Sequence, residues 1–243
     1  MILYDAAYGS SNRLLAHLRE ADQERLQPHL QTLTLDYERS LYRAHEPIEF
    51  VYFIESGVAS LVNTLQNGAA AEVGTIGNEG MVGLPVLLGE TEAPTSVYVQ
   101  VPGSGLRMSA TIFEAELDRS VSLRKVMLRY AHAMFNQVAQ SAACAHFHPL
   151  ERRCSRWLLM THDRMLSNEF LLTQKFLAMM LGVRRAGVTE AAGALQRAGL
   201  IRYRHGNVTI LDRDGLEERS CECYAVTKAE FDRLLGASNS DQV

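Results

Sequence analysis

The segment from Leu172 to Leu211 constrains the fold more than any other part of the sequence. A helical pattern begins after Thr173, a residue type that caps helix N-termini, and it is interrupted at Gly182. Glycine just past a helix end is suited to a left-handed turn, so we expect the chain to change direction there. The buried face of this first helix is predicted to carry Phe176, Leu177 and Met180.

A second helix is predicted at residues 184–198, with Val183 filling the corner between the two helices. Its apolar spacing predicts a buried face formed by Val188, Ala191 or Ala192, and Leu195. Two β-rich runs, 200–203 and 208–211, flank a turn at 204–207 with Gly206-Asn207 as the turn-forming pair. Helix, glycine turn, helix and hairpin together indicate a winged helix-turn-helix.

This arrangement predicts which side chains contact DNA. A recognition helix enters the major groove N-terminus first, so its first two turns are expected to contact bases through Arg184, Arg185, Thr189 and Glu190. Phosphate contacts are expected from Thr173, Gln174, Lys175, Arg202 and Arg204. The formal net charge of the chain is −4, but residues 172–213 hold seven basic and two acidic side chains. Such a basic segment within an acidic protein attracts phosphate.

The first part of the chain predicts a β-rich domain. After short amphipathic helices within residues 11–31, β-rich runs span 50–54, 59–65, 71–76, 96–101 and 105–108. Turn signals separate these runs at residues 55–57, 66–68, 77–80 and 102–103. Short strands punctuated at such intervals are typical of a barrel or a sandwich.

A long helix is predicted after this domain, from about Ala110 to Ala145. Such a helix packs its apolar stripe on its own core or against a partner helix in a dimer, and the pattern does not distinguish the two. Pro149 ends the helical run, so we place a boundary between domains 1–148 and 149–243. The stripe contains Leu123, Met127, Tyr130, Met134, Gln137 and Ser141.

Composition and length narrow the class of protein. The 243 residues are 47% hydrophobic and 21% charged, which is typical of a globular protein of one or two domains. No apolar run is long enough for a membrane helix, and residues 1–20 lack the pattern of a secretory signal. We therefore expect a cytoplasmic protein with no membrane partner. The sequence has no catalytic triad, phosphate-binding loop or dinucleotide-binding glycine motif, and we therefore expect that the protein is not an enzyme.

The four cysteines are Cys144, Cys154, Cys221 and Cys223, too few for a disulfide scaffold. Cys144 and Cys154, with His146 and His148, form one potential donor set for a metal ion. Cys221 and Cys223 form a potential redox pair or half of a metal site. The two histidines lie only two residues apart, and cysteines separated by one residue form a strained disulfide. We therefore expect these residues to pack, and we expect no metal.

The same segments carry a resemblance to a known family. The run LTQKFLAMMLGVRRAGVTEAAGALQRAGLI, residues 172–201, is similar without gaps to the helix-turn-helix of the Crp/Fnr family of transcription regulators. Upstream, LYRAHEPIEFVYFIESGVASLV resembles the early β-roll of that family, and IGNEGMVGLPVLLG resembles the segment around its phosphate-binding cassette. Residues 112–145 then correspond to the dimerisation helix. The resemblance spans about residues 33–212.

The resemblance implies an α+β fold with an N-terminal cyclic-nucleotide-binding-like β-roll, a long dimerisation helix and a C-terminal winged helix-turn-helix. It implies a homodimer that binds a near-palindromic operator in double-stranded DNA under the control of a small-molecule effector. RNA polymerase is a further partner of such regulators. Arg185 falls on the arginine with which the family contacts guanine.

The candidate effector pocket, formed by Gly83, Leu84, Thr95 and Ser96, departs from the family pattern. Members that bind cyclic AMP place a Glu on the ribose hydroxyl and an Arg-Ser pair on the phosphate. Leu84 and Thr95-Ser96 occupy these positions here. Because a buried phosphate without a cationic partner is costly to desolvate, we expect no tight binding of cyclic AMP and no cofactor. The sequence leaves three alternatives open: another nucleotide, an apolar effector, or no ligand.

An alternative function is a β-roll that binds a small molecule or acts as an enzyme, with a C-terminal domain that only packs against it. Salt-sensitive binding to duplex DNA distinguishes the regulator from this alternative.

Overall fold

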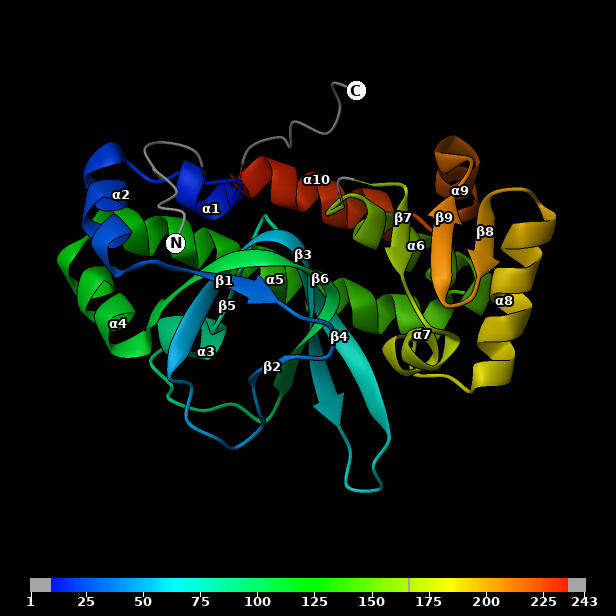
Figure 1. Ribbon diagram of the computed structural model, residues 1–243, viewed down its shortest axis with the longest axis horizontal. Coiled ribbons are helices and arrows are strands. Elements are labelled where there is room, and N and C mark those ends of the chain that lie inside the picture. The colour runs from blue at the N-terminus through cyan, green and yellow to red at the C-terminus, as the bar shows by residue number, and fades with distance from the viewer. Residues whose placement is uncertain (1–9, 166, 236–243) are drawn as a thin grey trace.

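The computed structural model describes residues 10–165 and 167–235, which form two lobes joined by one long helix (Figure 1). The first lobe is a β-roll with short helices around it, so the predicted N-terminal helices and β-rich domain are confirmed. Its elements are α1 (Arg13–Ala16), α2 (Glu20–Leu26), the 3-10 helix η1 (Gln27–His29), β1 (Gln31–Leu35), β2 (Ser40–Tyr42), β3 (Phe50–Thr64), β4 (Ala70–Ile76), β5 (Met81–Val82), α3 (Leu84–Leu87), β6 (Ser96–Ser109) and α4 (Ala110–Arg119).

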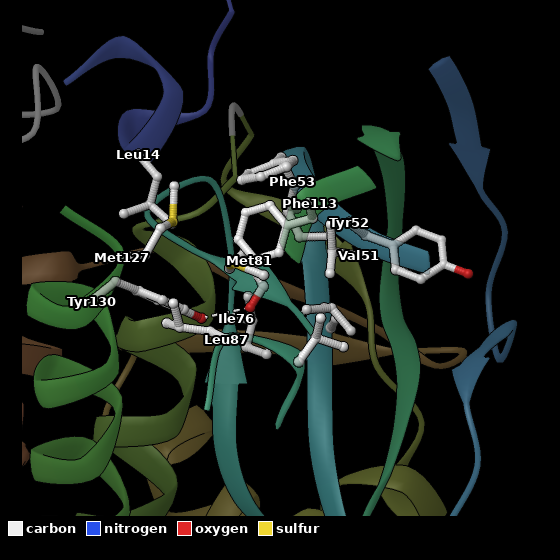
Figure 2. Packing of buried hydrophobic residues seen from close by; sticks show 14 of the residues in the cluster. Leu14, Val51, Tyr52, Phe53, Ile76, Met81, Leu87, Phe113, Met127 and Tyr130 are labelled. Carbon is white, nitrogen blue, oxygen red and sulfur yellow. Dashed lines mark hydrogen bonds between the residues drawn. The ribbon is translucent and has the colours of Figure 1, made fainter. Parts of the chain in front are cut away.

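The strands of the β-roll form one antiparallel sheet in the order β1-β6-β3-β4, with β2 paired to β6 and β5 paired to β3. The two long strands, β3 and β6, pair with each other and form its centre. Phe53 of β3 is fully buried and meets Phe113 of α4, with 6.1 Å between the ring centroids (Figure 2). Edge-to-face aromatic packing of this kind ties the helical layer to the sheet.

Two of the predicted turns are irregularities inside long strands. β3 runs through residues 55–57 and β6 runs through 102–103, with shifts of register where these segments pair. Gly57 has a φ of +85°, and a Cβ atom there would lie 2.5 Å from the carbonyl oxygen of Val101. A Cβ atom at Gly103 would lie 2.1 Å from the carbonyl oxygen of Ser56. These glycines therefore permit bulges between closely spaced strands, and the prediction that a turn separates two strands at each of these places is wrong.

The predicted long helix is divided at Ser120. α4 ends at Arg119, and α5 (Val121–Phe147) starts after Ser120, whose hydroxyl oxygen accepts a hydrogen bond from the Leu123 N–H at 3.2 Å. The same hydroxyl donates to the carboxylate of Asp22 at 2.6 Å. This cap lets the chain turn between two helices, so the single helix expected at 112–145 is wrong.

The apolar stripe of α5 packs on the β-roll of the same chain. Tyr130 is fully buried and Met134 is 2% exposed. The Tyr130 hydroxyl donates to the carbonyl oxygen of Met81 at 2.8 Å, and Figure 2 shows this ring pointing from α5 toward Met81. The backbone N–H of Thr75 donates to Oε1 of Gln137 at 2.9 Å. The stripe is therefore part of the intramolecular core, and any partner helix must use another face of α5.

The second lobe begins directly after Pro149. Its first helix packs Trp157 and Leu158 into a core shared with the later helices and a small sheet, ordered β7-β9-β8. The strand β7 was not predicted from the sequence. The elements are α6 (Leu150–His162), β7 (Glu169–Leu171), α7 (Gln174–Met180), α8 (Arg185–Arg197), β8 (Ile201–Arg204), β9 (Asn207–Ile210), α9 (Arg213–Arg219) and α10 (Cys223–Leu235).

The last helix, α10, returns from the second lobe and lies along α5 (Figure 1). Phe231 and Leu235 of α10 join the hydrophobic core of the first lobe. The side-chain amide of Asn136 on α5 donates to the carboxylate of Glu230 on α10 at 2.8 Å. One flank of α5 is thus covered by α10 and another by the β-roll. Among the described residues, no helix has both the length and the apolar character needed to cross a membrane.

Candidate nucleic-acid interface

The first helix of the predicted helix-turn-helix is α7, and Thr173 caps it as expected. The hydroxyl oxygen of Thr173 accepts a hydrogen bond from the backbone N–H of Phe176 at 3.1 Å. Phe176, Leu177 and Met180 are buried, as predicted. The cap fixes where the helix begins, and the apolar face fixes its rotation on the core.

The turn after α7 is set by Gly182, which has a φ of +63°. The Gly182 N–H donates to the carbonyl oxygen of Met179 at 3.1 Å, and the Val183 N–H donates to that of Ala178 at 3.0 Å. This pair of hydrogen bonds is a Schellman motif, which ends a helix through a left-handed residue. Val183 then packs against the second core, so the predicted roles of Gly182 and Val183 are confirmed.

The second helix, α8, has one side packed in the core of the second lobe and the other side exposed to solvent. Val188, Ala191, Ala192 and Leu195 form the buried face, in agreement with the sequence prediction. Arg184 is the N-cap residue, with an extended backbone. The structure places all four predicted base-contacting residues in exposed positions at the start of α8: Arg184, Arg185, Thr189 and Glu190.

The beginning of α7 lies beside the first turns of α8. The Thr189 hydroxyl is 3.2 Å from Oε1 of Gln174 and 3.1 Å from the carbonyl oxygen of Arg185. Gln174 and Thr173 are half-buried, and Lys175 is exposed. Three of the residues predicted to contact phosphate are thus collected at one helix start, next to the exposed end of α8.

The wing is the β8–β9 hairpin, and its tip differs by one residue from the prediction. Arg204 pairs with Asn207, so the two-residue loop is His205-Gly206. His205 has a φ of +50° and Gly206 a φ of +81°, as a type I′ turn requires. The turn predicted at residues 204–207 is thus confirmed, but its central pair is His205-Gly206 rather than the predicted Gly206-Asn207.

The wing carries exposed positive charge and is held to α8 and to the residue that precedes the cap of α7. Arg202 and Arg204, predicted phosphate contacts, are exposed on β8. The Tyr203 hydroxyl donates to the carbonyl oxygen of Leu172 at 2.7 Å, and the Tyr203 N–H donates to Oε1 of Gln196 at 2.8 Å. His205 is also exposed at the tip, a position that the correct hairpin register would have revealed.

A contact that the sequence does not predict joins this module to the β-roll. The ring of Tyr37, between β1 and β2, lies 6.1 Å from the ring of Phe176 on α7. A Cβ atom on Gly182 would lie 3.4 Å from the Cβ atom of Ala71 on β4. The turn of the helix-turn-helix therefore packs on the first lobe, whereas α8 lies at the outer edge of the second (Figure 1).

The four residues of the candidate effector pocket are engaged within the protein. Leu84, the first residue of α3, packs against the first core. The hydroxyl oxygen of Ser96 accepts a hydrogen bond from the backbone N–H of Ala44 at 2.9 Å, and Thr95 hydrogen-bonds to Tyr42. Gly83 has a φ of +107°, and a Cβ atom there would lie 2.8 Å from the Val51 side chain. None of these four residues offers a charged side chain to a ligand.

A cavity of about 300 Å³ lies between the two lobes, against β4, α5 and α6. Glu72 and Gln137 line it from the first lobe and the long helix, and Arg153, Arg156 and Trp157 line it from α6. Burial raises the pKa of Glu72 to about 7, although Ser60 and Trp157 hydrogen-bond to its carboxylate. The cavity thus has polar and apolar walls and is bounded by both lobes.

The cysteines do not group as their spacing suggested. Cys154 is buried in the core of the second lobe, and His146 is exposed on α5. The potential donor set of these two with Cys144 and His148 is therefore not assembled, and Cys154 packs in a core as expected. Cys144 and His148 instead lie beside Cys221 and Cys223, whose segment returns to α5 at the start of α10.

Comparisons with known proteins agree with this architecture. Residues 34–120 match the cyclic nucleotide-binding domain, and residues 152–219 match the Crp-like helix-turn-helix domain. No curated protein sequence matches the chain.

Solved structures of regulators share the fold. FixK2 from Bradyrhizobium japonicum is 14% identical, with a TM-score of 0.68 over 79% of this chain and 98% of its own. A CRP-family transcriptional regulator from Thermus thermophilus is 20% identical, with a TM-score of 0.62 over 77% and 96%. The c-di-GMP responsive global regulator CLP from Xanthomonas campestris is 17% identical, with a TM-score of 0.59 over 79% and 99%.

Proposed function

The chain belongs to the Crp/Fnr family of transcription regulators, and we propose that it binds a near-palindromic operator as a homodimer, with the start of α8 in the major groove. The observation that carries this proposal is the exposed group at the start of α8. Arg184, Arg185, Thr189 and Glu190 cover its first two turns, while the opposite face is held in the core. A helix anchored in this way presents its N-terminal side chains to base edges.

Phosphate contacts on either side of α8 would fix its depth and register. Lys175 lies at the start of α7, and Arg202 and Arg204 lie on the wing, all three exposed. Thr173 and Gln174 offer a hydroxyl and an amide beside them. Such contacts carry no sequence information, but they set the orientation of the recognition helix on the duplex.

Dimerisation is proposed through the face of α5 that neither the β-roll nor α10 covers. Val121, Leu128 and Phe135 are 69%, 47% and 71% exposed and are spaced by seven residues. Apolar side chains repeating every seven residues form the seam of a two-stranded coiled coil. Two-fold symmetry would then place two α8 helices about one DNA turn, roughly 34 Å, apart, which matches a near-palindromic site.

The effector of this regulator is proposed to be a small molecule other than cyclic AMP. Leu84, Thr95 and Ser96 support this, because none supplies the charges that a cyclic phosphate and ribose require. The cavity between the lobes, with Arg153 and Arg156 beside Glu72, is a second place for such a molecule. A ligand there would contact both lobes and so bias their relative position.

The test is binding-site selection from random duplex DNA, followed by titrations at several salt concentrations. The proposal expects a two-fold symmetric motif and an affinity that falls steeply as salt rises. The double variant Arg184→Ala/Arg185→Ala should lose the motif but keep the fold, as judged by its thermal unfolding. A wild-type protein that enriches no sequence and binds DNA at no salt concentration would favour the alternative, a β-roll that binds or converts a small molecule.

A further inference from the structure

Three thiols and one imidazole converge where the long helix ends. Cys144 lies in the last turn of α5, His148 directly follows this helix, and Cys221 and Cys223 lie at the start of α10. The potential ligand atoms of all four lie within 4.8 Å of one another. The Cys144 and Cys221 sulfur atoms are 3.5 Å apart, and the Cys223 sulfur is 3.4 Å from Nδ1 of His148.

Local geometry explains how two short motifs supply four donors. Cys144 and His148 are four residues apart, so they lie on the same side of the helix end. Cys223 is the first residue of α10 and Cys221 lies two residues before it, and the packing of that helix on α5 brings both to the same place. The three thiols are buried, at 1%, 2% and 1% exposure, and form a small cluster of their own.

The surroundings of the cluster resemble the outer shell of a metal site. Nε2 of His148, the ring nitrogen facing away from the sulfur atoms, lies 3.2 Å from the carboxylate of Glu222. A carboxylate on the far nitrogen orients a ligating histidine and raises its basicity. The side-chain amide of Gln140 donates to the Cys223 sulfur at 3.0 Å, a contact that stabilises a thiolate. Packing among thiols alone requires neither contact.

We propose that Cys144, His148, Cys221 and Cys223 form a tetrahedral zinc site that ties α10 to the end of α5. Bonds of about 2.3 Å from zinc to sulfur place neighbouring sulfur atoms about 3.8 Å apart, close to the 3.5 Å between the Cys144 and Cys221 sulfur atoms. Three thiolates and an imidazole suit a borderline-soft ion such as Zn²⁺ and disfavour Mg²⁺ or Ca²⁺. Iron–sulfur clusters need ligands on opposite sides of a multi-atom core, so this compact group fits a single ion.

The position of the site gives it a structural consequence. Cys144 and His148 belong to the junction just before Pro149, whereas Cys221 and Cys223 follow the whole helix-turn-helix. An ion bound by both pairs would therefore connect the two ends of the segment that contains the helix-turn-helix and would hold both ends at α5. Zinc bound only by the folded state stabilises it, so its removal should lower the melting temperature and free the start of α10.

The test uses the full-length protein, purified with a reductant and stripped of metal with a chelator. Titration with Co²⁺ should give one ion per chain, with the intense visible bands of tetrahedral coordination and a charge-transfer band from thiolate to cobalt. Zn²⁺ should displace the cobalt stoichiometrically and raise the melting temperature. Cys221→Ser, Cys223→Ser and His148→Asn should each lose tight binding, whereas the matched control Cys154→Ser, a buried cysteine outside the cluster, should keep it.

Two outcomes would overturn the proposal. The first is reduced wild-type protein that takes up neither Co²⁺ nor Zn²⁺ while thiols are lost in air to a disulfide, which would identify a redox pair instead. The second is binding that survives in the cluster variants and disappears in Cys154→Ser. The cobalt spectrum of the wild-type protein keeps the test decisive even if a variant fails to fold, because the charge-transfer intensity reports how many thiolates bind.

Discussion

The carboxylate of Glu79 lies 2.7 Å from the guanidinium of Arg164, in an ion pair that joins the two lobes. Glu79 stands in the loop between β4 and β5, and Arg164 follows α6. Their side chains are only 5% and 8% exposed. Burial alone would raise the pKa of Glu79, but the charge and hydrogen bonds of Arg164 hold it below its usual value. The pair therefore stays ionised and links the helix-turn-helix lobe to the β-roll.

Removing one member of this pair should destabilise the protein strongly. Arg164→Ala leaves a buried carboxylate without its partner, and a loss of about 3–5 kcal/mol is expected in urea unfolding at neutral pH. Because the pKa of Glu79 is lowered in the folded state, the ion pair stabilises the protein above the unfolded-state pKa of this carboxyl, and this stabilisation is lost on acidification.

Arg43→Ala is the matched control, because Arg43 and Glu46 form an ion pair with 4.0 Å between the charged atoms and side chains that are 65% and 59% exposed. This control should change stability by less than about 1 kcal/mol. Equal effects of the two variants would contradict a buried pair.

Glu72 should make stability fall as pH rises toward neutrality. Its folded-state pKa is raised from 4.5 to about 7 by burial, so between these values the folded protein holds a proton that the unfolded chain has released. Its stabilising effect is thus complete below pH 4.5 and is lost as the pH rises through about 7. The charges of Arg156 and Arg164 limit this rise in the pKa of Glu72.

The variant Glu72→Gln keeps a hydrogen-bond acceptor for Trp157 and should flatten the profile of stability against pH between pH 5 and 8. The control Glu90→Gln, at an exposed position, should not change this profile. Parallel wild-type and Glu72→Gln profiles would refute the assignment.

The helix-turn-helix could be predicted from sequence because its determinants are local. The Thr173 cap, the left-handed Gly182 and the spacing of Val188 and Leu195 all lie within one short segment. Each feature favours the same structure as its neighbours, so propensity and packing agree. Only the wing tip, displaced by one residue, depended on strand register, which the local pattern does not fix.

The β-roll was predictable as a class but not in its strand lengths. Gly57 and Gly103 carry the same sequence signal as turn glycines, yet each lies inside a strand. Their role comes from the close approach of β3 and β6, which are far apart in sequence. A similar limit applies to Cys144 and Cys221, which are separated by 77 residues and meet only because α10 returns to α5. Spacing along the chain favoured Cys154, which lies in another core.

A charge on the exposed face of α5 should separate the dimer without unfolding the protein. Phe135 is 71% exposed, whereas its neighbour Met134 is 2% exposed and packs on Gly74. Phe135→Glu should shift the protein toward monomer in sedimentation and weaken operator binding, with little change in urea unfolding. Met134→Glu should instead destabilise the fold, because it buries an unpaired charge. A Phe135→Glu protein that remains dimeric and binds DNA normally would move the interface away from this face.

Cyclic AMP should neither bind tightly nor change DNA affinity. The two positions that would contact ribose and phosphate hold Leu84 and Thr95, and Ser96 already bonds to the Ala44 N–H. A hydrogen bond to a charged group contributes about 1.5–3 kcal/mol, so two missing contacts predict a loss of affinity of several hundredfold or more. Calorimetry and a gel shift with and without cyclic AMP test this, with 5′-AMP as the control nucleotide. Low-micromolar binding that also raises operator affinity would contradict the prediction.

Arg185 should determine one base of each half-site. It is exposed on the first turn of α8, where a guanidinium can donate two parallel hydrogen bonds to guanine O6 and N7. Arg185→Ala is expected to weaken specific binding by about 1–3 kcal/mol and to relax the preference for one G·C pair per half-site.

Lys175→Ala is the comparison, because the loss of a phosphate contact should weaken binding to all sequences alike and lower the slope of log affinity against log salt concentration by about 1. Site selection with each variant, together with salt titrations, separates the two effects. An unchanged motif for Arg185→Ala would assign base contact to Arg184 or Glu190 instead.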